Sequence, residues 1–146
     1  MKDRIKNIFI EGPISPAKIG ESIAHHQSKT QIGAHALFLG QVRADTFEGK
    51  TVEAIEYTAQ TEIANQVCHE IREEAFSQYE LSCMHIYHSL GVVKKGEICF
   101  FVFVSSGHRT PVFDSLSELV NKIKARVPVF GKELFEDQTH QWKVNQ

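Results

Sequence analysis

The chain has 146 residues and a net charge of -2, and hydrophobic residues make up 42% of it. These values fit one ordinary globular domain over residues 1–146 and exclude a disordered chain, which combines low hydrophobicity with high net charge. The longest apolar runs, such as 98–104, are too short to span a bilayer, so we expect no membrane partner. A mildly acidic chain also lacks the dense basic face that nucleic-acid binding requires.

Turn residues and apolar periodicity predict the elements along the chain. In order, these are a strand over 4–11, a helix opened by Ser15 and Pro16 that runs to about residue 26, a strand over 33–42, a polar loop over 44–50, a strand over 51–57, a helix over 61–78, strands over 82–89 and 97–105, a helix over 114–126 and a last edge strand over 129–135. Strands that alternate with helices but include a hairpin indicate an α+β fold. We expect a mixed, largely antiparallel sheet with two long helices packed on it.

Apolar spacing predicts which side of each long helix is buried. The first long helix has apolar residues four apart, and the second has a comparable stripe: Ile63, Val67, Ile71 and Ala75, then Leu116, Leu119, Val120 and Ile123. Three cysteines form no CxxC pair, so we expect no disulfide framework and a cytoplasmic location. Cys99 lies in the most apolar strand, which favours buried packing.

Neither a nucleotide-binding glycine motif nor a metal-ligand spacing is present. His25 and His26 are adjacent and cannot share a helix face, which favours surface histidines. His85 and His88 are three apart in a strand and face opposite sides of the sheet. We therefore expect no metal site and no nucleotide-binding loop.

The segment Ser105–Pro111 joins an apolar strand to a helix, where unpaired N–H groups favour an anion. His108 and Arg109 add a titratable donor and a bidentate guanidinium to that position. In the alternative interpretation, Ser105 or Ser106 caps the helix and the two cations are solvated.

Other cations lie elsewhere in the sequence: Arg43 at the end of a strand, Lys124 beside the buried face of the second long helix, and Lys132 in the last strand. Lys124 is either a surface lysine or a partly desolvated, reactive one. Because Arg109 and Lys124 are 15 residues apart, a continuous helix separates them by about 22 Å. The sequence therefore indicates either two separate clusters or a symmetric homodimer that joins them, and we favour the homodimer.

Taken together, several segments resemble the large, catalytic subunit of molybdopterin synthase. The similarity runs in order through residues 33–43, Glu56–Tyr57, 88–91, 104–109, 123–133 and Trp142. The resemblance implies an α+β fold and a homodimer at the core of a heterotetramer, with one small ubiquitin-like sulfur-carrier subunit at each end. That partner carries a C-terminal Gly-Gly thiocarboxylate, which would transfer sulfur to cyclic pyranopterin monophosphate and form the molybdopterin dithiolene without a cofactor.

The resemblance also implies the site residues. The substrate-binding positions are Gln41, Val42, Arg43, His108, Arg109, Lys124, Gly131, Lys132 and Glu133, with Lys124 and Lys132 as the catalytic candidates. A cyclic phosphate is an anion, which suits arginine and histidine side chains. Lys124 could stabilise or protonate the negative charge that sulfur transfer develops.

The chain departs from the family pattern at Gly131, where a second active-site lysine is usual. Lys132 could take over if the strand bends at the glycine, whereas a regular strand would point Lys132 to the other face. An alternative function is a non-catalytic dimeric module that binds a phosphorylated ligand or a partner's C-terminal tail. A hydrolase with His108 as base is weaker, because no nucleophile supports it.

Overall fold

The structure is a computed structural model that describes residues 4–144. Its three helices are α1 (Pro16–His26), α2 (Thr61–Gln78) and α3 (Arg109–Arg126). Its strands are β1 (Phe9–Glu11), β2 (Ala34–Gln41), β3 (Thr46–Phe47), β4 (Lys50–Ala59), β5 (Cys83–Lys94), β6 (Ile98–Ser106), β7 (Val129–Phe135) and β8 (His140–Trp142). Within this part of the chain, no helix has the length and apolar character needed to cross a membrane.

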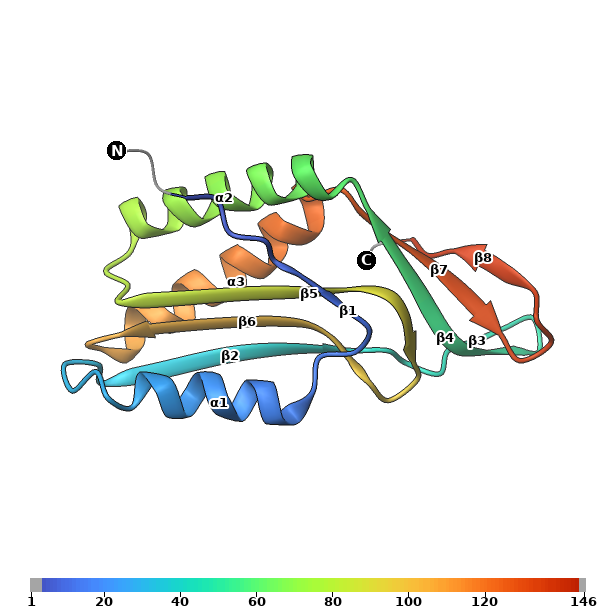
Figure 1. Cartoon of the computed structure of the whole chain (residues 1–146), viewed down its shortest axis with the longest axis horizontal. Helices are drawn as coiled ribbons and strands as arrows, with labels where there is room; N and C mark the ends of the chain where they lie inside the picture. The colour runs from blue at the N-terminus through green and yellow to red at the C-terminus, as the bar shows by residue number, and fades with distance from the viewer. Residues whose placement is uncertain (1–3, 145–146) are drawn as a thin grey trace.

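The strands form one sheet in the order β2-β6-β5-β4-β7-β8, with β1 beside β5 and β3 beside β4. Every pairing is antiparallel except the parallel pairing of β1 with β5. Helices α2 and α3 cover one face of the β2-β6-β5 part, and α1 lies on the other face (Figure 1). The mixed α+β architecture with two long helices on the sheet is confirmed.

Strand β5 is long and bent, and it joins the two parts of the sheet (Figure 1). Its first half pairs with β6 as far as His88, and its second half pairs with β4 from Gly91 onward. Gly91 has a φ of 81°, a conformation that favours glycine. Because of this bend, β4, β7 and β8 extend away from the strands that the helices cover. The start of β7 lies beside the end of α3.

Alternation along β6 divides the apolar core between the two faces. Phe100, Val102 and Val104 pack in the cluster beneath α2 and α3, whereas Phe101 and Phe103 pack with Ile14 and Ile19 at α1. Burying a side chain of this size stabilises a fold by about 1.5–3 kcal/mol. The uninterrupted apolar run of β6 is thus the sequence of a strand covered on both faces.

Several expected element boundaries differ from the structure. Only residues 9–11 of the expected first strand form a strand, and the expected loop at 44–50 contains the short strand β3. Helix α3 begins at Arg109 rather than 114, because Pro111 is tolerated in the first turn. The last strand is not an edge, since β8 pairs with β7 beyond it.

The buried face of α2 also differs from the expected one. Ile63 is 54% exposed, and the buried residues are Ala64, Cys68, Ile71 and Ala75. The buried residues at positions 64, 68, 71 and 75 belong to the core cluster that α2 shares with α3 and the sheet. Apolar spacing by four predicted the neighbouring face of the helix instead. In α3, Leu119, Val120 and Ile123 are buried as expected, while Leu116 is only partly buried.

Candidate functional site

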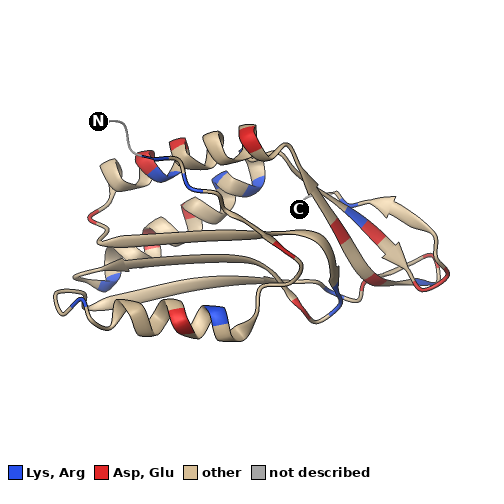
Figure 2. Ribbon diagram, in the orientation of Figure 1, with Lys and Arg blue, Asp and Glu red and all other residues tan. Residues whose placement is uncertain are grey.

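Helix α3 carries predicted site residues at both of its ends. His108 is the N-cap residue, Arg109 is the first helical residue, and Lys124 lies in the last turn. All three side chains are exposed. Figure 2 shows the basic residues at the two ends of the helix. Because α3 is continuous, about 22 Å of helix separates Arg109 from Lys124, and one chain does not bring them together.

The N-terminus of α3 has no side-chain cap. Ser106 is buried; its Oγ donates to the carbonyl of Glu80 at 2.6 Å and lies 3.5 Å from the His108 N–H. The alternative interpretation, in which Ser105 or Ser106 caps this helix, is therefore wrong on that point. The first turn of α3 instead presents N–H groups next to two exposed basic side chains, an arrangement suited to an anion.

Arg43 lies at the opposite end of the sheet from His108. Strand β2 pairs antiparallel with β6, from Ala34 opposite Ser106 to Gly40 opposite Phe100, and Arg43 follows just beyond. Its Nε lies 3.4 Å from the Asp45 carboxylate, and the side chain is 70% exposed.

The two residues before Arg43 differ in accessibility. Gln41 is exposed, but the Val42 side chain is buried. The Val42 N–H donates to the Glu97 carbonyl at 3.0 Å, and its carbonyl accepts from the Gly96 N–H at 2.8 Å. Val42 therefore anchors this corner of the sheet, and Gln41 and Arg43 present the accessible side chains.

Strand β7 separates the three predicted residues 131–133 between two faces. Gly131 lies opposite Tyr57 and Lys132 opposite Glu56, in unbroken register. The Lys132 ammonium lies 3.3 Å from the Glu56 carboxylate and 5.9 Å from the Trp142 ring centroid. A regular strand thus points Lys132 to the face opposite Gly131. Glu133 shares the face of Gly131, is buried, and accepts a 3.2 Å hydrogen bond from Gln141.

A cluster that the sequence did not single out lies beside Gly131. The Tyr57 hydroxyl donates to the Cys99 Sγ at 3.4 Å, and the Cys99 thiol donates to the Gly40 carbonyl at 3.5 Å. The His88 ring contacts the Tyr57 ring edge-on, with centroids 4.9 Å apart. These contacts link β4, β5, β6 and β2 at the end of the sheet from which Arg43 leaves.

A β-bulge explains why Cys99 reaches this cluster. The β2–β6 register passes from Gly40 opposite Phe100 to Gln41 opposite Ile98, so Cys99 has no partner residue. The extra residue lets Cys99 and Phe100 both face the core beneath α2 and α3. The expectation that Cys99 is buried is confirmed, and its thiol is used as a polar link.

The titratable groups of this cluster stay uncharged near neutral pH. Burial raises the pKa of the Tyr57 hydroxyl, and the neighbouring Cys99 thiol adds to the increase. Burial also raises the pKa of Cys99, against the opposing effects of Tyr57 and the Lys124 ammonium. Burial lowers the pKa of His88 to about 4, with a further contribution from Lys124. Lys124 therefore lies within electrostatic range of both His88 and Cys99.

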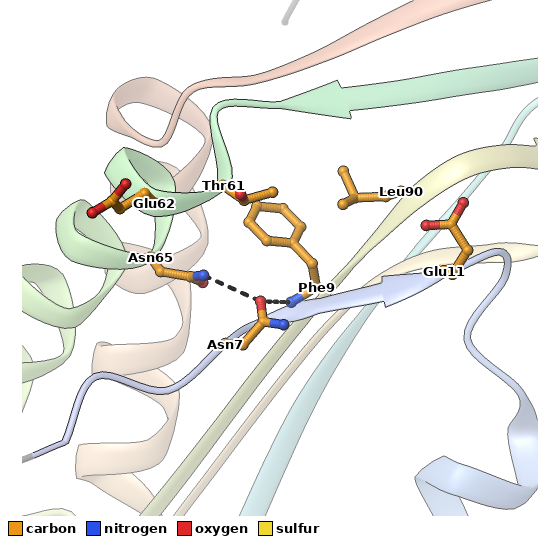
Figure 3. Close-up of a pocket in the computed structure, with 7 residues that line it drawn as sticks. All are labelled: Asn7, Phe9, Glu11, Thr61, Glu62, Asn65 and Leu90. Carbon is orange, nitrogen blue, oxygen red and sulfur yellow. Dashed lines mark hydrogen bonds between the residues drawn. The ribbon is translucent and has the colours of Figure 1, made fainter.

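One pocket over the described residues lies outside this cluster. Its volume is about 380 Å³, and it is lined by Asn7, Phe9, Glu11, Thr61, Glu62, Asn65 and Leu90 (Figure 3). The side-chain Oδ1 of Asn7 accepts from the Asn65 Nδ2–H at 3.1 Å and from the Phe9 backbone N–H at 3.1 Å. The lining includes two carboxylates and no basic side chain, so this pocket does not suit a phosphate.

The histidines are placed partly as expected. His85 and His88 face opposite sides of the sheet, as predicted: His85 contacts His26 beneath α1, and His88 contacts Tyr57. His26 is 1% exposed, so its assignment to the surface is wrong. Its Nδ1–H donates to the Ser22 carbonyl at 2.6 Å, which satisfies the buried ring. Residues 4–144 contain no group of three or more side chains placed to hold a metal ion.

Comparisons with known proteins agree with this fold. The MoaE protein family model matches residues 10–126. The molybdopterin synthase catalytic subunit of Aspergillus clavatus is 35% identical over 139 residues, which are 95% of this chain and 69% of that protein. Molybdopterin synthase from Staphylococcus aureus has a TM-score of 0.80 and 25% identity, covering 97% of this chain and all of that one.

A second structural neighbour is one chain of the complex of subunits 1 and 2 of molybdopterin-converting factor from Helicobacter pylori. Its TM-score is 0.79, with coverage of 94% of this chain and 90% of that one. At 14% identity, this neighbour supports the fold alone. The family model and the curated relative carry the assignment. The chain therefore belongs to the MoaE family, the family of the molybdopterin synthase catalytic subunits.

Proposed function

We propose that this chain is the sulfur-transferring subunit of molybdopterin synthase in molybdenum cofactor biosynthesis. It would accept the thiocarboxylated C-terminal tail of a small ubiquitin-like subunit and transfer sulfur to cyclic pyranopterin monophosphate. Two such transfers give the dithiolene. We place this reaction in the cytoplasm, in keeping with three free cysteines.

The observation that carries the proposal is the position of Lys124. It lies at the end of α3, within electrostatic range of His88 and Cys99, at the end of the sheet that also carries Arg43. A lysine there can stabilise or protonate the charge that develops when sulfur leaves an acyl carbon. Arg43 supplies a guanidinium for the substrate phosphate.

A symmetric homodimer would complete the site. His108 and Arg109 lie at the far end of α3, so they can join Lys124 only from a second copy of the chain. In this arrangement, each substrate pocket combines Arg43 and Lys124 of one copy with the His108–Arg109 pair of the other. The small subunits would occupy the two ends of that dimer as a heterotetramer.

The test is a stoichiometric reaction of the protein with thiocarboxylated small subunit and cyclic pyranopterin monophosphate, followed by mass spectrometry of the dithiolene product. We expect product from the natural chain and a loss of at least about 100-fold in rate for Lys124→Ala, the range for one acid–base or electrostatic group. A stable complex without product would favour the alternative, a binding module. Gly131 supports that alternative, since it leaves this face of β7 without a side chain at that position.

A further inference from the structure

Tyr57 is the only side chain in its cross-strand row on β4, β5 and β7. It lies opposite Gly91 in β5 and opposite Gly131 in β7. A Cβ atom added at Gly131 would lie 3.2 Å from the Tyr57 Cε1 and 3.0 Å from the Ile55 Cγ2. The Tyr57 ring therefore occupies space that a side chain at residue 131 would also need.

The Tyr57 hydroxyl starts a directed chain of hydrogen bonds. It donates to Cys99, and the Cys99 thiol donates to the Gly40 carbonyl, so each group has a defined partner. Gly40 is the last paired residue before the bulge, and Gln41, Val42 and Arg43 follow it directly. A contact at Gly40 thus acts on the backbone that sets where Arg43 leaves the sheet.

The chemistry of Cys99 favours this structural use over attack on an acyl carbon. The Cys99 residue is 7% exposed, and burial raises the pKa of its thiol, so the nucleophilic thiolate is disfavoured. A partly buried phenol such as that of Tyr57 favours a hydrogen-bond partner, and the bulge places the Cys99 thiol where it accepts that bond. The same cluster lies within electrostatic range of Lys124.

The geometry points to Tyr57 as a positioning residue: through Cys99 and the Gly40 carbonyl, its hydroxyl fixes the β-bulge that aims Gln41 and Arg43 at the substrate phosphate. This inference rests on the proposed function, because it assigns Arg43 to the phosphate of cyclic pyranopterin monophosphate. Gly131 contributes to the same arrangement, because the absence of a side chain there leaves space for the Tyr57 ring.

The experiment measures the dissociation constant of cyclic pyranopterin monophosphate by calorimetry, alongside dithiolene formation and thermal unfolding. Tyr57→Phe removes only the hydroxyl, and we expect it to weaken binding by about fivefold, the worth of one hydrogen bond. Cys99→Ala should weaken binding equally, and the double variant should be no weaker than either single one. Cys99→Ser keeps a donor and acceptor and should bind like the natural chain.

Tyr79→Phe is the matched control. Tyr79, the C-cap residue of α2, also donates a hydrogen bond from its hydroxyl, to Glu118 of α3, and the loss of that bond should leave substrate binding unchanged. Unchanged binding in Tyr57→Phe, or a lowered melting temperature without weaker binding, would overturn the inference. If a Tyr57 variant does not fold, the comparison of Cys99→Ser with Cys99→Ala decides it.

The two proposals fail in different ways. Absence of product from the natural chain, with binding intact, overturns the sulfur-transfer function and leaves the Tyr57 measurement interpretable. Product that forms normally, with equal binding by the natural chain, Tyr57→Phe and Cys99→Ala, overturns only the positioning role.

Discussion

Arg109 and Lys124 lie at opposite ends of one continuous helix of 18 residues, about 22 Å apart. A small phosphorylated substrate cannot contact both from the same chain. The two basic groups serve one reaction only if the site is shared between two copies of the chain, which is the arrangement of a symmetric dimer.

A shared site predicts that two inactive variants restore each other. Arg109→Ala and Lys124→Ala should each lose sulfur transfer when tested alone. In a mixed dimer, one of the two sites contains both substitutions and the other contains neither. Random exchange of equal amounts should therefore recover about one quarter of the natural activity, measured as dithiolene formed per chain. No recovery after verified subunit exchange would place both residues in separate sites.

Lys124 and Lys132 should differ strongly in their effect on turnover. Lys132 pairs with Glu56 on the face of β7 opposite Gly131, whereas Lys124 lies beside the Tyr57–Cys99–His88 cluster. We expect Lys132→Ala to lower the rate by less than about tenfold, against at least about 100-fold for Lys124→Ala. Single-turnover rates with saturating small subunit measure the difference. Equal losses would mean that Lys132 reaches a substrate from its own face of the sheet.

The fold was largely predictable because its signals are local. Residues 61–78 form the expected helix, and the apolar run at 98–104 forms a strand buried on both faces. The errors came from tertiary context that periodicity does not contain. Ile63 is exposed because the face of α2 with Ala64, Cys68 and Ala75 is the one that enters the core cluster. Strand β7 is internal because a further short strand pairs with it.

The site was predictable only in part, for a related reason. Cationic side chains at element ends stand out in a sequence, so Arg43, Arg109 and Lys124 could be identified. The role of Tyr57 depends on a bulge and on contacts across four strands, which leave no local pattern. Tyr57, Gly91 and Gly131 are far apart in the sequence, and only the strand register shows that the tyrosine lies between the two glycines.

Gly131→Ala should impair binding without destabilising the fold. The added Cβ crowds the Tyr57 ring and Ile55, which displaces the phenol from Cys99. The cost of crowding, about 1 kcal/mol or more, is offset by the lower chain entropy of alanine, about 0.4–1 kcal/mol. We expect substrate binding weakened by about fivefold, as for Tyr57→Phe, with a melting temperature that changes little.

Gly20→Ala is the control for that substitution. Gly20 lies in α1 with no atom within 4 Å of an added Cβ, so alanine should stabilise the helix by up to about 1 kcal/mol. Its substrate binding should match that of the natural chain. Normal binding by Gly131→Ala would show that the Tyr57 ring tolerates a neighbour.

The unfolding free energy should fall as the solution is acidified below pH 6.5. Burial, then contact with His26, lowers the pKa of His85 to about 4, and burial lowers that of His88 to about 4. Between pH 6.5 and 4, the unfolded chain binds protons at these two positions and the folded chain does not. Each histidine then reduces stability by about 1.4 kcal/mol per pH unit within that window. Its contribution is complete above pH 6.5, declines between pH 6.5 and 4, and is lost below pH 4.

The His26–His85 pair offers a direct check of that pH dependence. His26 Nδ1 donates to the Ser22 carbonyl, so in the neutral pair its Nε2 accepts from the His85 Nε2–H at 3.0 Å. His85→Gln keeps an N–H donor for His26 but cannot titrate. Urea unfolding at pH 7, 6 and 5 should show that this variant loses less stability on acidification. The difference should be about 1.4 kcal/mol per pH unit, which is the effect of one bound proton. His140→Gln, at an exposed position in β8, should keep the natural slope. Parallel curves for all three proteins would rule out His85 as a source of the acid sensitivity.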